Sequence, residues 1–584
     1  MLNKLMQLSL KNRLVVLIAA IGLLLFGIYT TVKLPVDVFP DFTAPTVSII
    51  TEAHGMAPEE VEMLVTFPIE TVVNGASGVR RVRSKSIQGL SIVWVEFEWG
   101  TEIYKARQIV NEKLQSTQNS IPEGVDQPIL APVTSIMGEI MLVGLTSETT
   151  SAMDLRTLAD FTIRRRLQSI SGTSQILVYG GENKQYQIQI NPYLLQKYKL
   201  SMQQILKAVS ESNVNATGGV FMGAGQEYLI RGIGRVRKLN DLEYTVVTTQ
   251  NKVPILIRDV AEVTIAPATR LGMAAINKKD GVMLVISKQP GANTLKLTGA
   301  IEKALEEIRP SLPSDVTLHT DIFKQADFIE VAIQNMVKAL RNGAVLVVLV
   351  LFVFLMNFRT TIISLTAIPL SLVVSFLVLR VLNLSINTMT LGGMAIAIGV
   401  LVDDSIIYVE NVYRRIRENA AKPETERRSF YAVVADASSE IQSSISMASP
   451  IVIIVFVPFF FLSGMEGRML TPLGLAYAVS IFASLMVAVT VTPALSFYLL
   501  KNVSNKQKGD IWLVRRLKQA YLPALKWSLH RKNWIISLAG FMVVTTLAFV
   551  PFMGRSFLPE FNEGTFNISF ATVPGTSLDE SNQI

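Results

Sequence analysis

Long uncharged runs divide this sequence into apolar segments and one extended polar region. Seven windows of at least 17 residues contain no Asp, Glu, Lys or Arg, and they cover residues 14–32, 342–358, 360–379, 381–402, 441–465, 469–500 and 533–554. A helix rises about 1.5 Å per residue, so each window, with a few flanking residues, can cross the roughly 30 Å hydrocarbon core of a bilayer. The pattern predicts seven transmembrane helices.

The first apolar window follows Lys4, Lys11 and Arg13, as in a signal peptide. It is long for that role, and residues 30–37 offer no small-residue cleavage site. We expect a retained membrane anchor.

The polar region between the first two windows has the patterning of a folded soluble unit. Period-two alternation and turn signals predict a first βαββαβ unit with strands at 46–52, 79–86 and 90–97 and helices at 58–73 and 103–120. A second unit is predicted from strands at 139–146, 173–179, 282–289 and 316–320 and helices at 153–169 and 293–308. Residues 180–267 then form an insertion with its own strands and a glycine-rich hairpin.

An internal repeat links the two ends of the chain. FPDFTAPTVSI at 39–49 matches LPEFNEGTFNI at 558–568, and Lys-Asn precedes both the first and the seventh window. Six spans separate the copies, so both enter the membrane in the same direction, as in a parallel repeat. A complete duplication needs about twice 520 residues, so we expect a truncated or split product.

Composition places the chain among membrane proteins. It is 50% hydrophobic and 17% charged, with a mean hydropathy of +0.39. The net charge is +8, and the Lys and Arg residues are concentrated in short segments that would be cytoplasmic with the N-terminus inside. One of these segments contains an amphipathic interfacial helix, which is expected at 510–530. The basic charge therefore reflects topology and gives no reason to expect nucleic acid as a partner. Cysteine is absent, so disulfides and thiolate ligands are excluded.

The stretch GVLVDDSIIYVEN at 399–411 carries the most distinctive chemistry. It places Asp403 and Asp404 inside the fourth span, where each Asp costs about 2.5 to 3.5 kcal/mol unless it faces protein or a water-lined cavity. Small residues share the face of Asp403 and would let a partner helix approach closely; they are Gly392, Ala395 and Gly399. Glu410 is either an accessory acid or part of a solvated helix end.

Adjacent carboxylates in an apolar setting raise each other's proton affinity, which suits a proton relay. The uncharged interiors of the other spans supply no cation for them, so a cationic partner must come from elsewhere. An intramembrane aspartyl protease needs aspartates on two helices, which adjacent residues do not provide. We expect neither an enzyme nor a cofactor.

One weaker site lies in the polar region. His54 and Met56, followed by Glu59 and Glu60, could hold a metal ion. The same residues also fit an ordinary loop that leads into a helix, and no second cluster of ligands is apparent.

Three motifs together resemble the resistance–nodulation–division (RND) family of proton-driven exporters. They are GVLVDDSIIYVENV at 399–412, VDVFPDF at 36–42 and FLPEFNEG at 557–564. The resemblance implies that Asp403 and Asp404 form a proton relay paired with a lysine on a tenth span. It also implies a homotrimer in the lipid bilayer of the bacterial inner membrane, joined to a periplasmic adaptor (membrane fusion) protein and an outer-membrane channel.

The branch of the family decides the expected substrate. EEVEMLVTFPIE at 59–70 and GTEIYKARQIVNEKL at 100–114 look like the heavy-metal-efflux branch, whereas paired aspartates look like the drug and amphiphile branch. Copper-exporting members place a methionine where this chain has Ser569, which argues against monovalent copper or silver. The expected substrate is a heavy-metal cation or an amphiphilic drug, and the alternative is a severed half-transporter without activity of its own.

The expected fold is an α+β membrane protein with seven transmembrane helices. Its large periplasmic domain would hold two βαββαβ porter subdomains and an inserted docking subdomain. The expected boundaries are 1–33 for the cytoplasmic N-terminus and first span, 34–131 for the first porter subdomain, 132–180 and 268–322 for the second, 181–267 for the docking subdomain, 336–358, 360–381, 389–412, 440–463 and 470–500 for spans two to six, 510–530 for the interfacial helix, 533–553 for the seventh span, and 554–584 for the truncated start of a second periplasmic domain.

Overall fold

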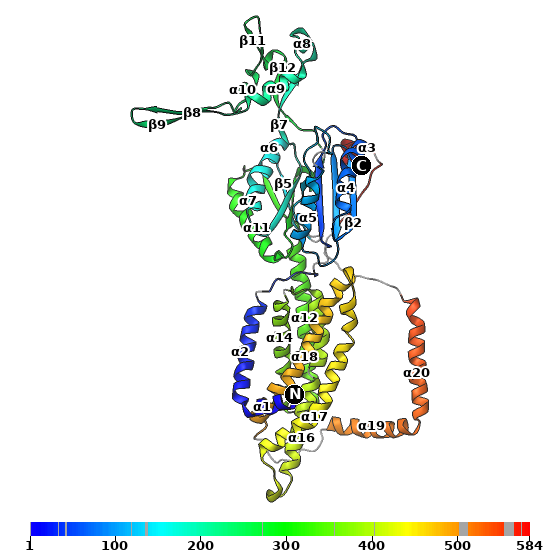
Figure 1. Cartoon of the computed structure of the whole chain (residues 1–584). Helices are drawn as coiled ribbons and strands as arrows, with labels where there is room; N and C mark the ends of the chain where they lie inside the picture. Colours follow the sequence, from blue (N-terminus) through cyan, green and yellow to red (C-terminus); the bar gives the residue numbers. More distant parts are fainter. Residues whose placement is uncertain are drawn as a thin grey trace. The chain divides into compact units, whose positions relative to one another are not determined.

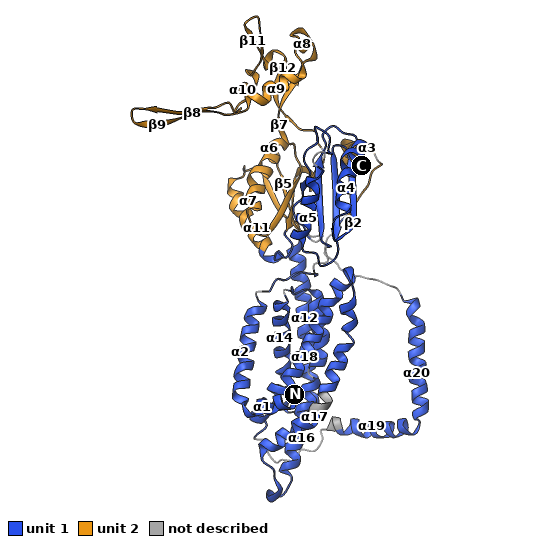
Figure 2. Cartoon of the chain, in the orientation of Figure 1, with its two compact units in different colours: residues 1–138, 289–296, 325–567 blue, residues 139–288, 297–324, 568–584 orange. Residues whose placement is uncertain are grey.

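The chain folds into two compact units in a computed structural model (Figure 2). Unit 1 comprises residues 1–138, 289–296 and 325–567, and unit 2 comprises residues 139–288, 297–324 and 568–584. The structure describes residues 2–32, 34–40, 44–117, 120–134, 138–270, 272–355, 357–382, 384–401, 403–501, 512–553, 566–573 and 575–584. The motif at 557–564 and the first two residues predicted for the interfacial helix lie outside the described residues.

Seven helical segments among the described residues are long and apolar enough to cross a membrane, and all belong to unit 1 (Figure 1). They are Arg13–Thr31, Gln325–Leu355, Phe358–Val381, Thr388–Ala420, Phe430–Phe461, Gly464–Leu499 and Lys532–Phe552. Each overlaps one of the uncharged windows, because a run of apolar side chains is enough to specify a helix where the backbone must satisfy its own hydrogen bonds.

Helix α18 (Gly464–Leu499) is the central helix of the bundle in unit 1. It contacts α2 (Arg13–Thr31), α14 (Ala367–Val381), α15 (Thr388–Leu401) and α17 (Phe430–Ile454). Its buried residues include many small ones, which allow close helix packing without a hydrophobic driving force from water; examples are Ala476, Ser480, Ala483, Ser484 and Ala488. By contrast, α2, α12 (Gln325–Leu355) and α20 (Lys532–Phe549) leave most of their apolar side chains exposed, as suits lipid neighbours.

Two further helices of unit 1 are amphipathic. α1 (Leu2–Lys11) buries Met6 and Leu10 in a cluster with side chains of α16 (Asp403–Ala420), α17 and α18. α19 (Trp512–His530) lies in the segment predicted to be an interfacial helix.

A four-stranded sheet forms the polar part of unit 1. Its order is β2 (Val79–Ile87), β3 (Leu90–Phe97), β1 (Thr46–Glu52) and β4 (Ile129–Leu130), with antiparallel neighbours. Alternate residues of β1 are buried, and Val47 and Ile49 pack against side chains of the helices at 58–74 and α5 (Ile103–Gln115). The helix predicted to reach residue 120 ends at Gln115, before the turn at Ser116 and Thr117.

Unit 2 contains a five-stranded sheet. Its order is β13 (Ala275–Ile276), β14 (Lys279–Lys288), β5 (Glu139–Thr146) and β15 (Thr317–Lys324), and β6 (Thr173–Gly180) also pairs with β14. Side chains of helices at 152–168 and from α11 (Thr294–Ile308) pack on this sheet. The last strand is longer than the predicted 316–320, because an irregularity between His319 and Phe323 absorbs the polar residues there and lets pairing with β5 resume.

The insertion in unit 2 leaves and rejoins the sheet region through a two-stranded ribbon. β7 (Lys184–Ile190) pairs with β12 (Ala261–Pro267) from end to end. Between them lie α8 (Pro192–Lys197), α9 (Met202–Ser212), α10 (Leu239–Glu243) and the pair β10 (Val246–Gln250) and β11 (Val253–Leu256). The predicted glycine-rich hairpin is confirmed as β8 (Ala216–Gly223) and β9 (Gln226–Gly232) (Figure 1).

Asp315 joins two segments of unit 2 just before β15. Its carboxylate accepts hydrogen bonds from the hydroxyls of Ser147, Thr149 and Thr150 and from the backbone N–H of Thr150, the last at 3.0 Å. These donors hold the pKa of the Asp315 carboxyl well below its usual range.

We predict that Asp315→Asn loosens β15 at neutral pH and that this difference fades in acid. A folded-state pKa below the unfolded value of about 3.9 means that the stabilisation is present above that pH and is lost as pH falls further. Hydrogen–deuterium exchange of residues 317–324, compared between the wild type and the variant at each pH, measures the effect. Glu262→Gln, an exposed change on β12, is the control. A difference of equal size at pH 7 and in strong acid would contradict this interpretation.

Candidate functional site

Asp403 and Asp404 begin helix α16 (Asp403–Ala420), directly after α15 (Thr388–Leu401). Together the two helices form the apolar span Thr388–Ala420, so the fourth span continues as helix beyond the predicted end at residue 412. Ion pairs between Arg415 and Glu418 support the extra turns, because residues three or four apart face each other on a helix. Asp403 is exposed in this chain and Asp404 is half-buried.

Asp404 bonds to a serine of the neighbouring helix α17. The Ser449 hydroxyl, on α17, donates to Oδ2 of Asp404 at 3.0 Å. Ser446 lies one turn away on the same face of α17, and Ser405 follows Asp404 directly. The hydroxyls of Ser405 and Ser446 are buried without a hydrogen-bond partner within the described part of the chain.

Asp404 belongs to a stripe of polar residues along α16. The stripe, which we call the α16 polar face, consists of Asp404, Tyr408, Asn411 and Arg415. Their spacing of four, three and four residues places them on one side of the helix. This face was not predicted from the sequence, although DSIIYVENVYRR at 404–415 shows the signal: polar residues at helical intervals within an apolar segment.

Each member of the α16 polar face bonds to α17. The Tyr408 hydroxyl donates to the Ser438 hydroxyl, and the Asn411 amide donates to the Ala437 carbonyl at 2.9 Å. Arg415 forms an ion pair with Glu440, with Nη2 and Oε1 2.7 Å apart. A change at Asp404 is therefore connected to the packing of two whole helices.

Helix α18 approaches α15 closely at Gly393, next to the face predicted to receive a partner helix. A methyl group on Gly393 would lie 2.4 Å from the Leu473 carbonyl oxygen of α18. At Gly392 and Gly399 it would meet no described atom within 4 Å, and Ala395 between them is half-buried. Within the described part of this chain, then, α18 packs beside that face and not on it. Packing of another helix on the face of Gly392, Ala395 and Gly399 stays a prediction.

Neither aspartate has a basic partner within the described ranges of the chain. Two arginines of α16 form ion pairs elsewhere: Arg414 contacts Glu418, and Arg415 contacts Glu418 and Glu440. Glu410 is exposed on α16, and its accessory role stays a prediction. A cationic partner from elsewhere for Asp403 and Asp404 also stays a prediction.

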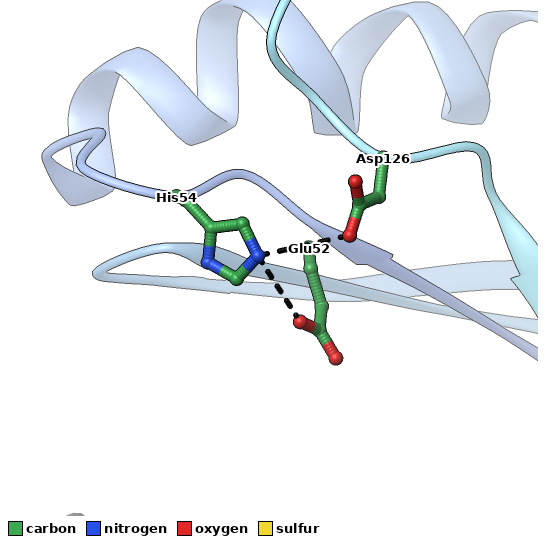
Figure 3. A group of neighbouring side chains, drawn as sticks. All are labelled: Glu52, His54 and Asp126. Atoms are coloured by element: carbon green, nitrogen blue, oxygen red, sulfur yellow. Dashed lines mark ion pairs between the residues drawn. The ribbon is translucent and has the colours of Figure 1, made fainter. Parts of the chain in front are cut away.

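A second constellation of ionisable residues lies on the four-stranded sheet of unit 1 (Figure 3). His54 Nε2 is 3.5 Å from Oε2 of Glu52 and 3.7 Å from Oδ2 of Asp126. His54 was predicted from the sequence as a weak metal candidate, but neither carboxylate was. Glu52 lies only two residues before His54, whereas Asp126 reaches it only through the fold. Met56, the other weak metal candidate, packs against the core of the sheet instead.

The helix-entry interpretation of the neighbouring acids agrees with the geometry. Glu60 accepts a hydrogen bond from the backbone N–H of Ala57 at 3.0 Å, which caps the helix that begins at Pro58. Glu59 is exposed in the first turn of that helix. Neither residue belongs to the His54 constellation.

Comparison with known proteins decides the family. Residues 5–584 match the family model described as the AcrB/AcrD/AcrF family. The chain belongs to this family. The resemblance to RND permeases is thereby confirmed. The heavy-metal branch is confirmed as well, because the relatives include one named "Cobalt-zinc-cadmium resistance protein CzcA", of Cupriavidus metallidurans, 32% identical over 100% of this chain and 55% of its own length, and the matching solved structure is that of a heavy metal efflux pump.

Two curated relatives illustrate the similarity. The chain is 32% identical over 595 residues to "Cation efflux system protein CzcA" of Alcaligenes sp. (strain CT14) and 32% identical over 588 residues to "Cation efflux system protein CusA" of Escherichia coli (strain K12). The alignments cover 100% of this chain but only 55% and 56% of the relatives. This AcrB/AcrD/AcrF-family chain thus spans about half the length of the curated relatives it matches.

Solved structures support the same fold. Two crystal forms of a heavy metal efflux pump match with TM-scores of 0.81 and 0.83 at 27% and 26% identity. They cover 95% and 99% of this chain, and 53% and 55% of the pump. The mixture of strands and long apolar helices is therefore that of an RND permease.

We predict that Gly393→Ala destabilises the helix bundle whereas Gly392→Ala does not. Both changes gain up to about 1 kcal/mol in helix propensity, but only the first forces a methyl group against the backbone of α18. Overpacking of this kind costs about 1 to 3 kcal/mol. Thermal unfolding of the purified protein in detergent measures the difference, and equal midpoints for the two variants would contradict the packing described.

Proposed function

We propose that this RND-family chain serves proton-driven export of a divalent heavy-metal cation across the bacterial inner membrane. The observation that carries the proposal is the Asp403–Asp404 pair inside an apolar span of a chain whose relatives are named cation efflux proteins. A carboxylate inside hydrocarbon is costly when ionised and much less so when protonated, so proton binding changes the energy of the surrounding helices.

Ser449 is a suitable partner for an aspartate that changes its protonation state. A hydroxyl can donate to a carboxylate and can also accept from a protonated carboxyl group. The contact between Asp404 and Ser449 can therefore persist in both states with the hydrogen bond reversed. A lysine or arginine in the same place would favour only the ionised form.

The α16 polar face offers a way to couple proton exchange to movement. Asp404 shares one helix face with Tyr408, Asn411 and Arg415, all of which bond to α17. Loss or gain of charge at Asp404 biases the packing of α16 on α17. Each proton that enters through a potential of 100 mV contributes about 2.3 kcal/mol to such a change.

The substrate proposal rests on the relatives and on the chemistry of this chain. A divalent cation fits the named cation efflux relatives and the absence of cysteine from the sequence. The names of these relatives do not support an amphiphilic drug as the substrate. They also give no support to the alternative that the chain is a severed half-transporter without activity of its own.

Location and partners follow from family membership and from the charge pattern. Loops rich in Lys and Arg support an N-terminus in the cytoplasm and a large polar region in the periplasm. Assembly as a homotrimer with a periplasmic adaptor and an outer-membrane channel is part of the proposal on family grounds.

We predict that Asp404→Asn abolishes metal export, because an amide cannot take up and release a proton in the physiological range. The measurement is the Zn²⁺ content of metal-loaded cells that produce the protein, followed with and without a protonophore. The wild type should lower cell Zn²⁺ only while the proton gradient is intact.

The matched control is Glu426→Gln, which removes one negative charge from an exposed segment just beyond α16. It should export like the wild type. Export by Asp404→Asn at the wild-type rate would contradict the proposed relay. A wild-type chain that never lowers cell Zn²⁺ would contradict the export proposal itself.

A further inference from the structure

We propose that Glu52, His54 and Asp126 form a surface site for a borderline divalent cation such as Zn²⁺ or Co²⁺. The three residues lie in unit 1, at the end of β1, in the turn that follows it and in the loop before β4. One ligand atom from each lies within 4.8 Å of the other two (Figure 3).

The backbone holds the three positions together independently of their side chains. The N–H of Asp126 donates to the carbonyl of Glu52 at 2.9 Å, so the two carboxylates come from hydrogen-bonded neighbours. Ala53, between Glu52 and His54, is fully buried, and its N–H donates to the Gly89 carbonyl at 2.8 Å. A binding site needs its side chains to be carried on a rigid backbone, and these hydrogen bonds provide one.

The turn after His54 is fixed in the same way. Gly55 has a φ of +81°, a conformation that glycine adopts without strain, and Met56 donates to the Ala53 carbonyl at 3.2 Å. The carbonyl of Met56 in turn accepts from Gly89 at 3.1 Å. His54 is therefore presented from a closed and anchored turn.

The distances suit a shared cation better than direct hydrogen bonds. Separations of 3.5 and 3.7 Å between Nε2 of His54 and the two carboxylate oxygens are longer than normal N–H···O bonds of about 2.7 to 3.2 Å. Ligand atoms about 2.0 to 2.2 Å from one tetrahedral ion lie roughly 3.3 to 3.6 Å apart. Small rotations of the exposed side chains would bring the three ligand atoms to the separations that a tetrahedral ion requires.

Exposure favours an exchangeable site over a structural one. The side chains of Glu52, His54 and Asp126 are 57%, 71% and 63% exposed. Ion pairs at such positions contribute about 0 to 1 kcal/mol, so their mutual attraction alone does not explain why they gather. Three protein ligands with an open side toward solvent leave coordination positions for water, as in sites that load and release their ion.

The donor set determines which ions fit. One imidazole and two carboxylates match Zn²⁺, Co²⁺ or Ni²⁺, whereas monovalent copper or silver prefers sulfur ligands. The two carboxylates also supply negative charge that attracts a divalent cation. This site goes beyond the proposed export function, because cation binding by the sheet requires no proton exchange at Asp404.

The test is equilibrium dialysis of the purified full chain in detergent against Zn²⁺, with bound metal counted by mass spectrometry. We expect His54→Ala and the double variant Glu52→Gln, Asp126→Asn each to lose one bound Zn²⁺ or to weaken its affinity at least about tenfold. Even the hydrogen-bond partners of metal ligands typically contribute about 10- to 100-fold to affinity, and a ligand contributes no less.

Three controls make the result specific. His530→Ala removes another exposed histidine, and Glu59→Gln removes a nearby exposed acid outside the cluster. Both should bind Zn²⁺ like the wild type, and circular dichroism should show the same helix content for all variants. Asp404→Asn should also keep this Zn²⁺ even where export is lost, so failure of the export proposal and failure of the site are distinguishable. Unchanged Zn²⁺ binding in His54→Ala, or no Zn²⁺ bound by the wild type, would overturn the proposal.

Discussion

The energetic cost of an ionised carboxylate inside an apolar helix bundle is the constraint on which the rest of this structure depends. At about 2.5 to 3.5 kcal/mol for each central Asp, Asp403 and Asp404 persist only where polar groups or water can reach them. The structure meets this need for Asp404 with Ser449 and with the polar contacts that continue along α16 and α17. Under the proposed relay, proton binding at Asp404 therefore acts on the packing of two long helices.

Helix α18 makes that arrangement possible by bringing small residues to the middle of the bundle. Its backbone meets α15 at Gly393, and Ser484 donates to the Leu401 carbonyl at 2.7 Å, just before the aspartates. One side of α15 is thus fixed, while the side of Gly392 and Gly399 meets no described atom within 4 Å. The aspartates lie at the boundary between a packed face and an open one, which is where a change of charge can alter helix packing most readily.

Sequence predicted the parts of the fold that depend on local patterns. The uncharged windows locate the long helices, and the alternation in TVSIITE gives β1 because one face of that strand is buried. The sequence did not predict contacts that depend on rotation about a helix axis. Gly392 and Gly393 point about 100° apart, so which of the two contacts α18 depends on the path of that helix. The longer β15 depends on an irregular pairing with β5 that no local pattern in the strand reveals.

The candidate sites also divide into features visible in the local sequence and features that depend on the fold. Asp403 and Asp404 stand out because charge is rare in an apolar run, and the α16 polar face was readable but missed because its members were considered singly. The carboxylate of Asp126 reaches His54 only through the pairing of β1 with β4, so it could not be found without the fold.

The most direct test of proton-coupled export is Zn²⁺ movement into proteoliposomes that contain the protein and an acidic lumen. Proton exchange at the aspartate pair predicts that Zn²⁺ accumulates inside as protons leave, with lumenal pH rising in step, and that both fluxes stop when the gradient is collapsed. Zn²⁺ entry at the same rate without a pH gradient would contradict it.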